Sequence, residues 1–258
     1  MGSFFKGAVA ALLATALFGP ISLNSASAAE GVAIPEQHWS FSAPFGSFDN
    51  EARQRGLQVY REVCSACHSL DYIAFRNLEA LGYSEEQVKA LAAQYTIEDG
   101  PNDEGDMFER PGKPSDYFPS PFPNAKAAAA ANGGAAPPDL SLIAKARPHG
   151  PDYIYALLTG YEEPPADFQL MEGLNYNAYF PGHQIAMAAP LSEGAVEFSD
   201  GTPATVDQMA HDVTTFLMWT AEPHLDASRE MGIKVMLFLV VFCFMLYAVK
   251  RKIWHDIH

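Results

Sequence analysis

The stretch that decides how this chain folds and functions is REVCSACHSL, residues 61–70. It places two cysteines, Cys64 and Cys67, two residues apart, and His68 follows the second cysteine directly. Three kinds of site share this pattern: a redox dithiol, half of a zinc site, and a covalent attachment site for c-type haem. The surrounding sequence has to discriminate among them.

The residues before the motif predict a helix rather than a strand. Asp49 or Asn50 can cap a helix whose apolar residues then recur at helical spacing up to the cysteines. A thioredoxin-like dithiol follows a strand in a βαβ pattern, and neither is visible here. A structural zinc site needs four ligands, yet the third cysteine of the chain, Cys243, stands alone in an apolar run.

Covalent haem attachment accounts for all three residues. The thiols of Cys64 and Cys67 add to the two vinyl groups of one porphyrin, because two intervening residues bring both sulfur atoms to one edge of the ring. His68 then lies beneath the iron and ligates it. The sequence therefore predicts one haem c, with His68 as an axial ligand.

Residues 1–29 have the pattern of an export signal. Lys6 precedes an apolar run over residues 8–18, and small residues follow at 26–29. The apolar run is short for a membrane helix, and Pro20 interrupts it. We expect a signal peptide over residues 1–29 and an exported haem domain over residues 30–230.

The C-terminal part predicts one membrane anchor. An uninterrupted apolar run covers residues 235–249, and residues 231–233 extend it because the long side chain of Lys234 can reach the membrane interface. The expected span is residues 231–250. Lys250, Arg251 and Lys252 end this run, and positively charged residues favour the cytoplasmic side. We therefore expect a single pass through a bacterial inner membrane, with the haem domain periplasmic and the basic tail, residues 251–258, cytoplasmic.

The expected exported part is strongly acidic. Residues 30–231 hold 11 basic and 30 acidic residues, whereas the chain as a whole has a net charge of −15. This excess of negative charge excludes a nucleic-acid-binding role and favours encounters with basic proteins. An alternative interpretation is that the negative charge only keeps the domain soluble.

The mature chain predicts helices joined by long loops. Capping patterns start helices at Ser84 and at Thr205, and prolines start two short ones near residues 138 and 151. Two stretches, residues 98–123 and 162–198, are irregular, and the second is long enough to line a site. We find no strand with clean alternation.

The residues alone leave several candidates for the second axial ligand. Met171 and Met187 both lie in the second irregular stretch, and Met187 has the more apolar surroundings, with Ile185 and Ala186 before it. A methionine ligand raises the reduction potential and suits electron transfer. His183 is the rival ligand, four residues before Met187.

At this point the chain resembles the cytochrome c1 family, the haem c subunits of the cytochrome bc1 complex. The resemblance runs from about Phe48 to Trp254 and includes a C-terminal anchor that ends in basic residues. It is carried by VCSACHSL (63–70), PPDLSLIAKAR (137–147), DYIYALLTGYEEPP (152–165), YFPGHQIAMAAPL (179–191), DGTPATVDQMAHDV (200–213) and FLMWTAEP (216–223).

The resemblance implies a mainly α fold, namely a class I cytochrome c-like haem domain with long loops plus one C-terminal transmembrane helix. It implies that Met187 is the second axial ligand. It also implies that Arg147 pairs with a haem propionate, that Tyr153 lies close to the haem, and that Pro138 packs at its proximal side. Ala186, where the family usually has glycine, is a departure that affects the expected shape of this loop.

The resemblance further implies a non-catalytic electron-transfer subunit. It would accept an electron from a Rieske iron–sulfur protein and pass it to a soluble cytochrome c during quinol oxidation. Its partners would be cytochrome b, these two proteins and membrane lipid, within a dimeric complex. Two other hypotheses remain: an anchored haem enzyme or sensor with an open sixth position, and an anchored carrier that serves another oxidase.

Overall fold

The structure is a computed structural model that describes residues 32–42 and 44–255. The expected signal peptide at residues 1–29 lies outside the described residues, and so do the last three residues of the expected basic tail. The described part of the chain is mainly helical, with two short two-stranded sheets.

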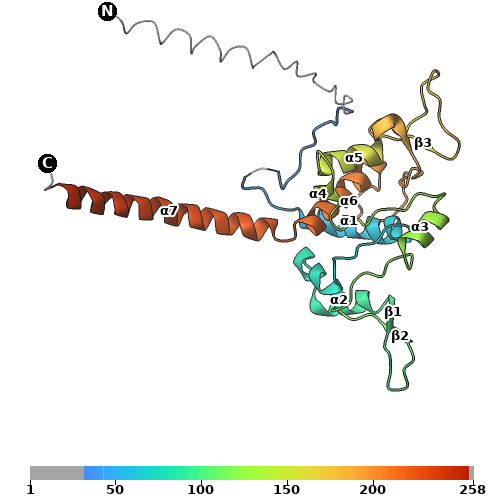
Figure 1. Ribbon diagram of the computed structural model, residues 1–258, viewed down its shortest axis with the longest axis horizontal. Coiled ribbons are helices and arrows are strands. Elements are labelled where there is room, and N and C mark those ends of the chain that lie inside the picture. Colours follow the sequence, from blue (N-terminus) through green and yellow to red (C-terminus); the bar gives the residue numbers. More distant parts are fainter. Residues whose placement is uncertain (1–31, 43, 256–258) are drawn as a thin grey trace, which may run out of the picture. The chain divides into compact units, whose positions relative to one another are not determined.

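Two crossing helices form the centre of the haem-domain region (Figure 1). They are α1 (Asn50–Glu62) and α6 (Val206–Ala221). The Asp49 side chain caps α1 by accepting a hydrogen bond from the Ala52 backbone N–H at 3.1 Å. Gly56 is needed at the crossing, because a Cβ atom there would collide with the Asp212 backbone.

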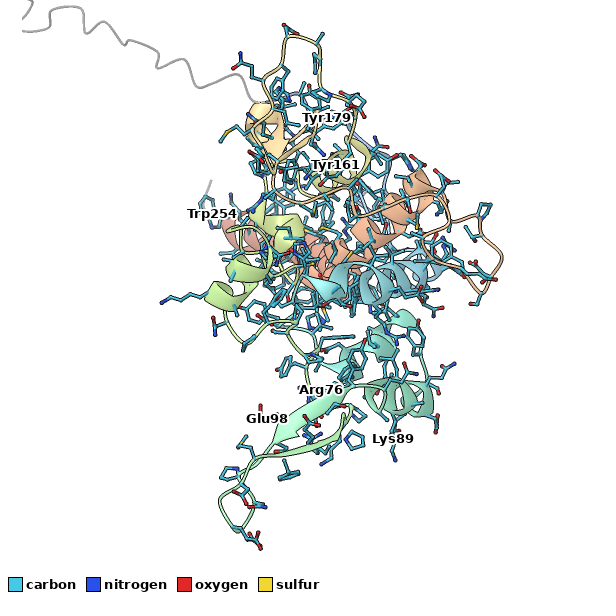
Figure 2. The ribbon with its side chains drawn as sticks, turned by 90° about the vertical axis from the view of Figure 1, so that its right-hand side faces the viewer. Arg76, Lys89, Glu98, Tyr161, Tyr179 and Trp254 are labelled. Atoms are coloured by element: carbon cyan, nitrogen blue, oxygen red, sulfur yellow. The ribbon has the colours of Figure 1, made fainter. Side chains whose placement is uncertain are left out.

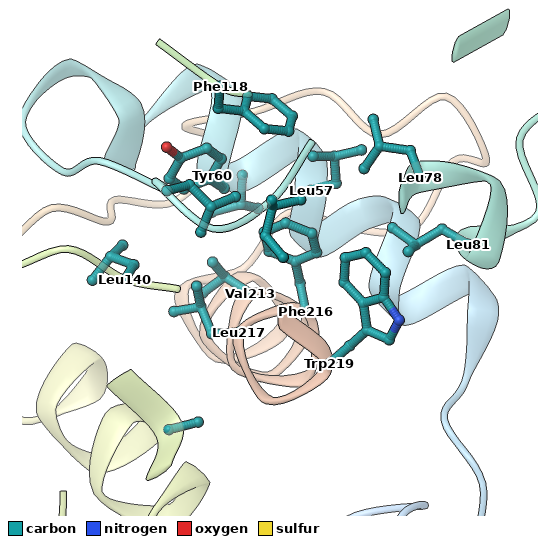
Figure 3. Close-up of a cluster of buried hydrophobic side chains, with 14 of the residues drawn as sticks. Leu57, Tyr60, Leu78, Leu81, Phe118, Leu140, Val213, Phe216, Leu217 and Trp219 are labelled. Atoms are coloured by element: carbon teal, nitrogen blue, oxygen red, sulfur yellow. The ribbon is translucent and has the colours of Figure 1, made fainter. Parts of the chain in front are cut away.

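A single apolar core surrounds this crossing (Figure 3). Side chains from α6 meet side chains from α1 and from the short helix η2 (Phe75–Leu81) that follows it. Each fully buried leucine or phenylalanine stabilises the fold by about 1.5–3 kcal/mol. The largest fully buried core residues are Leu57, Val59, Tyr60, Leu70, Phe75, Leu78, Leu81, Val88, Met209, Val213, Phe216 and Trp219.

The described residues also form shorter helices, two short sheets and the long helix α7, which extends away from the core in Figure 1. They are η1 (Cys64–Ala66), α2 (Glu85–Ala92), β1 (Thr96–Asp99), β2 (Phe108–Pro111), α3 (Ala125–Ala131), α4 (Ile143–Ala146), α5 (Pro151–Thr159), β3 (Asn175–Tyr176), η3 (Pro181–His183), β4 (Gln184–Ile185) and α7 (Leu225–Trp254).

One expectation about the first irregular stretch is wrong. Part of residues 98–123 forms an antiparallel hairpin, in which β1 pairs with β2 and Glu98 lies opposite Glu109. Its exposed and half-buried residues are mostly polar, so the strands have no apolar alternation that the sequence could reveal. The hairpin is held instead by Arg110, which pairs with Asp99 and Asp116.

Two helices are shorter than the sequence predicts. α1 ends at Glu62, so the cysteines follow it in the tighter turn η1 rather than within the helix. The expected helix near residue 138 is reduced to α4, because the side chain of Asp139 makes tertiary hydrogen bonds instead of starting a helix. Its carboxylate accepts hydrogen bonds from the Ser69 hydroxyl and the Asp71 backbone N–H, both at 2.8 Å.

α7 is the one helix in the described residues that is long and apolar enough to span a membrane. It has 30 residues and contains the predicted span 231–250. None of its residues is buried, in agreement with a helix that has lipid or another protein around it. Near its start, α7 contacts the segment just before α1, since Arg229 donates to the Gly46 carbonyl at 2.7 Å.

A buried ion pair joins α1 to α6 and gives a first prediction. Arg55 donates to the fully buried Asp212 carboxylate at 2.7 and 3.2 Å, and to the partly exposed Asp200 at 2.9 Å. Replacing Asp212 with alanine leaves a largely buried charge without its main partner, so we expect a loss of about 3 kcal/mol in the free energy of unfolding. Urea denaturation followed by circular dichroism measures it.

The matched control is Asp200→Ala. The Asp200 side chain is 42% exposed, so its pairing is screened by water and its loss should cost less than about 1 kcal/mol. Equal losses for the two variants would contradict the assignment of Asp212 as the main anchor of Arg55.

Candidate functional site

The Cys-x-x-Cys-His motif forms one compact turn after α1. The backbone N–H groups of Cys67 and His68 both donate to the Cys64 carbonyl, at 3.1 and 2.9 Å. The Ser65 hydroxyl closes the turn by donating to the Arg61 carbonyl at 2.7 Å. Both thiols are free, with Cys64 half-buried and Cys67 exposed. The turn therefore presents two thiols and an imidazole within five residues.

One nitrogen of the His68 ring makes a hydrogen bond within the protein. Nδ1 lies 2.8 Å from the Pro138 carbonyl oxygen, and a carbonyl only accepts, so Nδ1 carries the hydrogen. Nε2 is left with its lone pair, which is the arrangement that metal-ligating histidines commonly have. Burial, partly offset by the hydrogen bond to Pro138, lowers the pKa of His68 and favours the neutral ring.

The partner of His68 is itself held in place. The Leu140 backbone N–H donates to the Ser69 carbonyl at 3.0 Å, next to the bonds that Asp139 accepts from residues 69 and 71. These contacts join the segment after Pro138 to the chain that follows His68. The orientation of the imidazole is thus fixed by a segment about 70 residues away in the sequence.

The Cys64 thiol does not resemble a reactive thiol of a redox dithiol. Burial raises the pKa of the Cys64 thiol to about 12, whereas reactive dithiols depend on a lowered pKa. In residues 32–42 and 44–255, no group of three or more His, Cys, Asp or Glu side chains is arranged to hold a metal ion. The donor set fits covalent haem c instead: two adjacent thiols and one oriented neutral imidazole.

Met187 lies at the end of a small, well-connected loop. It is half-buried, and its backbone carbonyl accepts a hydrogen bond from the Tyr161 hydroxyl at 3.1 Å. Met171, the other methionine of the irregular stretch, is 65% exposed and so lacks a water-poor environment. This contrast favours Met187 as the thioether donor.

His183, the rival ligand, has a different environment. Its ring stacks on Tyr176 with the ring centres 5.8 Å apart and meets the edge of Phe168 at 6.3 Å. Its Nδ1 atom is buried and has no hydrogen-bond partner among the described residues. The backbone of His183 has a φ of +58°, a left-handed conformation that non-glycine residues seldom adopt.

Arg147 directly follows α4 and lies near Tyr153, which is in the first turn of α5. Arg147 is exposed, and its guanidinium makes one long hydrogen bond of 3.4 Å, to the Ala146 carbonyl. Burial raises the pKa of Tyr153, and the positive charge of Arg147 partly offsets this. An exposed guanidinium with so weak a partner remains available to an anionic group such as a propionate.

The structure thus gathers the predicted residues into two groups. Cys64, Cys67, His68 and Pro138 form the first. The second lies about the two ends of α5: Arg147, just after α4, is near Tyr153 in the first turn of α5, and Met187 is tied to Tyr161 just beyond its last turn. A pocket lined by Leu142, Lys145, Ala146 and Ala221 contains none of the predicted ligands.

Sequence reasoning missed two residues of the second group. The Tyr161 hydroxyl donates to the Met187 carbonyl. Asn177, in the loop that leads to Met187, is fully buried and forms a β-bridge with Tyr161. Figure 2 shows Tyr161 near Tyr179 at the end of the domain opposite to Glu98. A polar residue in a segment without periodicity gives no sign of burial, so only the fold could identify Asn177.

The chain matches known proteins along most of its length. The sequence profile of the Cytochrome C1 family matches residues 39–257. "Cytochrome c1" of Rhodospirillum rubrum is 50% identical, over 98% of this chain and 97% of its own length. "Cytochrome c1, heme protein, mitochondrial" of Schizosaccharomyces pombe is 48% identical, over 93% of this chain and 78% of its own.

A longer relative also matches. "Cytochrome b/c1" of Bradyrhizobium diazoefficiens is 55% identical over 97% of this chain, which spans 40% of that protein's length. The family profile covers most of the sequence, and relatives from bacteria and from yeast align along nearly all of it. The chain therefore belongs to the cytochrome c1 family.

Proposed function

We propose that the chain is a membrane-anchored, mono-haem c electron-transfer subunit of a cytochrome bc1 complex. It accepts an electron from a Rieske iron–sulfur protein and passes it to a soluble cytochrome c during quinol oxidation. Two observations support this: membership of the cytochrome c1 family, and relatives whose names include "heme protein" and "Cytochrome b/c1". The chain is not an enzyme on its own, because quinol oxidation belongs to the complex.

The residues divide the work of holding the cofactor. Cys64 and Cys67 bind haem c covalently, His68 supplies the proximal axial ligand, and Met187 supplies the distal one. The observation that carries this assignment is the His68 ring, whose Nδ1 is fixed to the Pro138 carbonyl at 2.8 Å and whose Nε2 is therefore free to ligate. When bound, the group supplies reversible one-electron exchange at its iron.

The chain's own residues tune and protect that exchange. The Met187 thioether favours a high reduction potential, and two protein ligands leave no position for a substrate. Arg147 supplies the cation for a propionate, and the half-buried Tyr153 helps to exclude water from the same side. No bond in a substrate has to form or break at such a site.

The anchor and the topology follow from the same assignment. Residues 231–250 cross a bacterial inner membrane and dock beside cytochrome b, whose apolar helices would cover the exposed side chains of α7. Residues 30–230 form the periplasmic haem domain, and the tail 251–258 is cytoplasmic. The acidic charge of the domain favours a basic soluble cytochrome c as acceptor, within the dimeric complex expected for the family.

Co-purification tests the proposed function. An affinity tag on the C-terminus should recover cytochrome b and a Rieske protein from detergent-solubilised membranes, and quinol should reduce the haem of this chain in the purified material. Membranes that contain the untagged chain provide the control for non-specific recovery. Recovery of a terminal oxidase without cytochrome b, or of the chain alone with an intact haem spectrum, would overturn the proposal.

A further inference from the structure

We propose that Asn177 and Tyr161 are positioning residues that hold Met187 in place by fastening its loop to the C-terminal end of α5. We call residues 177–187 the distal loop. The inference rests on the proposed function, in which Met187 is the distal axial ligand, and it adds the residues that keep this ligand from leaving.

Asn177 is the central fastener. Its side chain is fully buried, and its amide Nδ2 donates to the Leu157 carbonyl of α5 at 2.8 Å. Its Oδ1 accepts from the backbone N–H groups of Tyr179 and Phe180, at 3.0 and 3.1 Å. One side chain therefore joins the helix to the start of the distal loop, and each of its polar groups has a partner.

The backbone of Asn177 extends the connection toward the ligand. Its N–H donates to the His183 carbonyl at 3.1 Å, which closes the turn between the start of the distal loop and the approach to Met187. Asn177 also forms an isolated antiparallel bridge with Tyr161, the second residue beyond α5. Asn177 thus connects both the start of the distal loop and its approach to Met187 to the C-terminal end of α5.

Tyr161 makes the second connection, directly at the ligand residue. Its hydroxyl donates to the Met187 carbonyl at 3.1 Å. The bond acts on the backbone of Met187, so it constrains where the thioether can reach without competing for the sulfur.

Close packing at Gly160 supports the two polar connections. The Gly160 carbonyl accepts from the Ala178 N–H at 2.9 Å, and the Tyr179 ring packs so closely on Gly160 that a Cβ atom there would collide with it. Figure 2 shows Tyr161 and Tyr179 as neighbours in this region. The distal loop therefore packs on the end of α5 by side-chain contact as well as by hydrogen bonds.

The loop needs such fastening because it has little regular structure of its own. Within it, η3 has three residues and β4 has two, and segments with so few backbone hydrogen bonds open at low free-energy cost. α5 packs on α6, and α6 crosses α1, which leads into the Cys64–His68 turn. The connection to α5 therefore relates the distal ligand to the proximal one through rigid helices.

The test compares two pairs of matched variants in the full chain, purified in its complex. Asn177→Ala is paired with Asn175→Ala, whose side chain makes only one marginal bond of 3.5 Å in the same stretch. Tyr161→Phe is paired with Tyr179→Phe, since the Tyr179 hydroxyl has no hydrogen bond among the described residues. The readouts are the thioether-to-iron charge-transfer band of the oxidised haem and the fraction of reduced haem that binds carbon monoxide.

We expect Asn177→Ala to weaken or abolish the band and to raise the carbon monoxide-reactive fraction about tenfold or more, because several buried hydrogen bonds are lost. Tyr161→Phe, which removes one bond, should raise that fraction by a smaller factor. Both control variants should match the unsubstituted chain, and covalent haem should be retained in all four. A purely structural role predicts a lower unfolding temperature with an unchanged band.

The results separate the inference from the function on which it rests. If the unsubstituted chain shows no thioether band, the assignment of Met187 fails. If it shows the band and neither Asn177→Ala nor Tyr161→Phe differs from its control, the positioning role is refuted while the assignment of Met187 stands. If Asn177→Ala does not accumulate, the Tyr161→Phe and Tyr179→Phe pair decides the question alone.

Discussion

The double substitution Cys64→Ser and Cys67→Ser is expected to abolish covalent haem attachment completely. Serine keeps the size and polarity of each side chain but cannot form a thioether, so haem has no covalent link to the chain. The measurement is the haem content after denaturing electrophoresis, together with the intact mass of the purified protein. Each single variant should keep one thioether and survive denaturation in reduced yield.

Cys243→Ser is the matched control, since Cys243 is exposed on α7 and belongs to no site described in this chain. It should keep its full haem content. Haem that remains covalently bound in the double variant would show that the attachment site has been assigned to the wrong residues, and haem loss in the control would lead to the same conclusion.

The second large effect is expected for Met187→Leu. Leucine fills a similar volume but offers no lone pair to the iron, so the distal position should open or take a different ligand. We expect the reduction potential to fall by on the order of 0.1 V, because axial ligands set haem potentials over a range of roughly 0.8 V. Reduced protein should also bind carbon monoxide, which the original chain should not do.

Met171→Leu removes the other methionine of the same irregular stretch and serves as the control. Its side chain is 65% exposed, so we expect an unchanged potential. If the potential moves with Met171 rather than with Met187, the distal ligand has been assigned to the wrong methionine. If neither variant changes it, His183 becomes the ligand to test, through the same substitution to leucine.

The helix starts were predictable because their signals are local. The Asp49 cap, the capping box from Ser84 to Gln87 and the proline at Pro151 each act on the first turn of their own helix, and all are confirmed. Thr205 likewise caps α6 by accepting from the Gln208 N–H. Such signals need no knowledge of what the helix packs against.

The errors in the fold concern segments that depend on distant partners. The β1–β2 hairpin is stabilised by Arg110 and two aspartates, and an ion-pair network leaves no periodicity in the sequence. α4 is short because Asp139 binds residues 69 and 71, far away along the chain. Local propensity cannot anticipate a competing tertiary hydrogen bond.

In the candidate site, too, the residues with local signals were predictable and those that depend on tertiary contacts were not. The Cys64–His68 turn was readable because its residues are adjacent and their chemistry requires that spacing. Pro138 came only from the resemblance to a family, whereas the apolar surroundings of Met187 already favoured it as a ligand and the resemblance then selected it over His183. Asn177 came from neither, because its importance lies in hydrogen bonds to α5 and to the distal loop that exist only after folding.

The central claim is that one imidazole and one thioether occupy both faces of a single haem iron in this chain. Near-infrared magnetic circular dichroism of the oxidised, unsubstituted protein tests it most directly, because the position of the low-spin charge-transfer band identifies the pair of axial ligands. The account predicts a band typical of histidine–methionine ligation. A band typical of two histidines, or a high-spin spectrum, would contradict it.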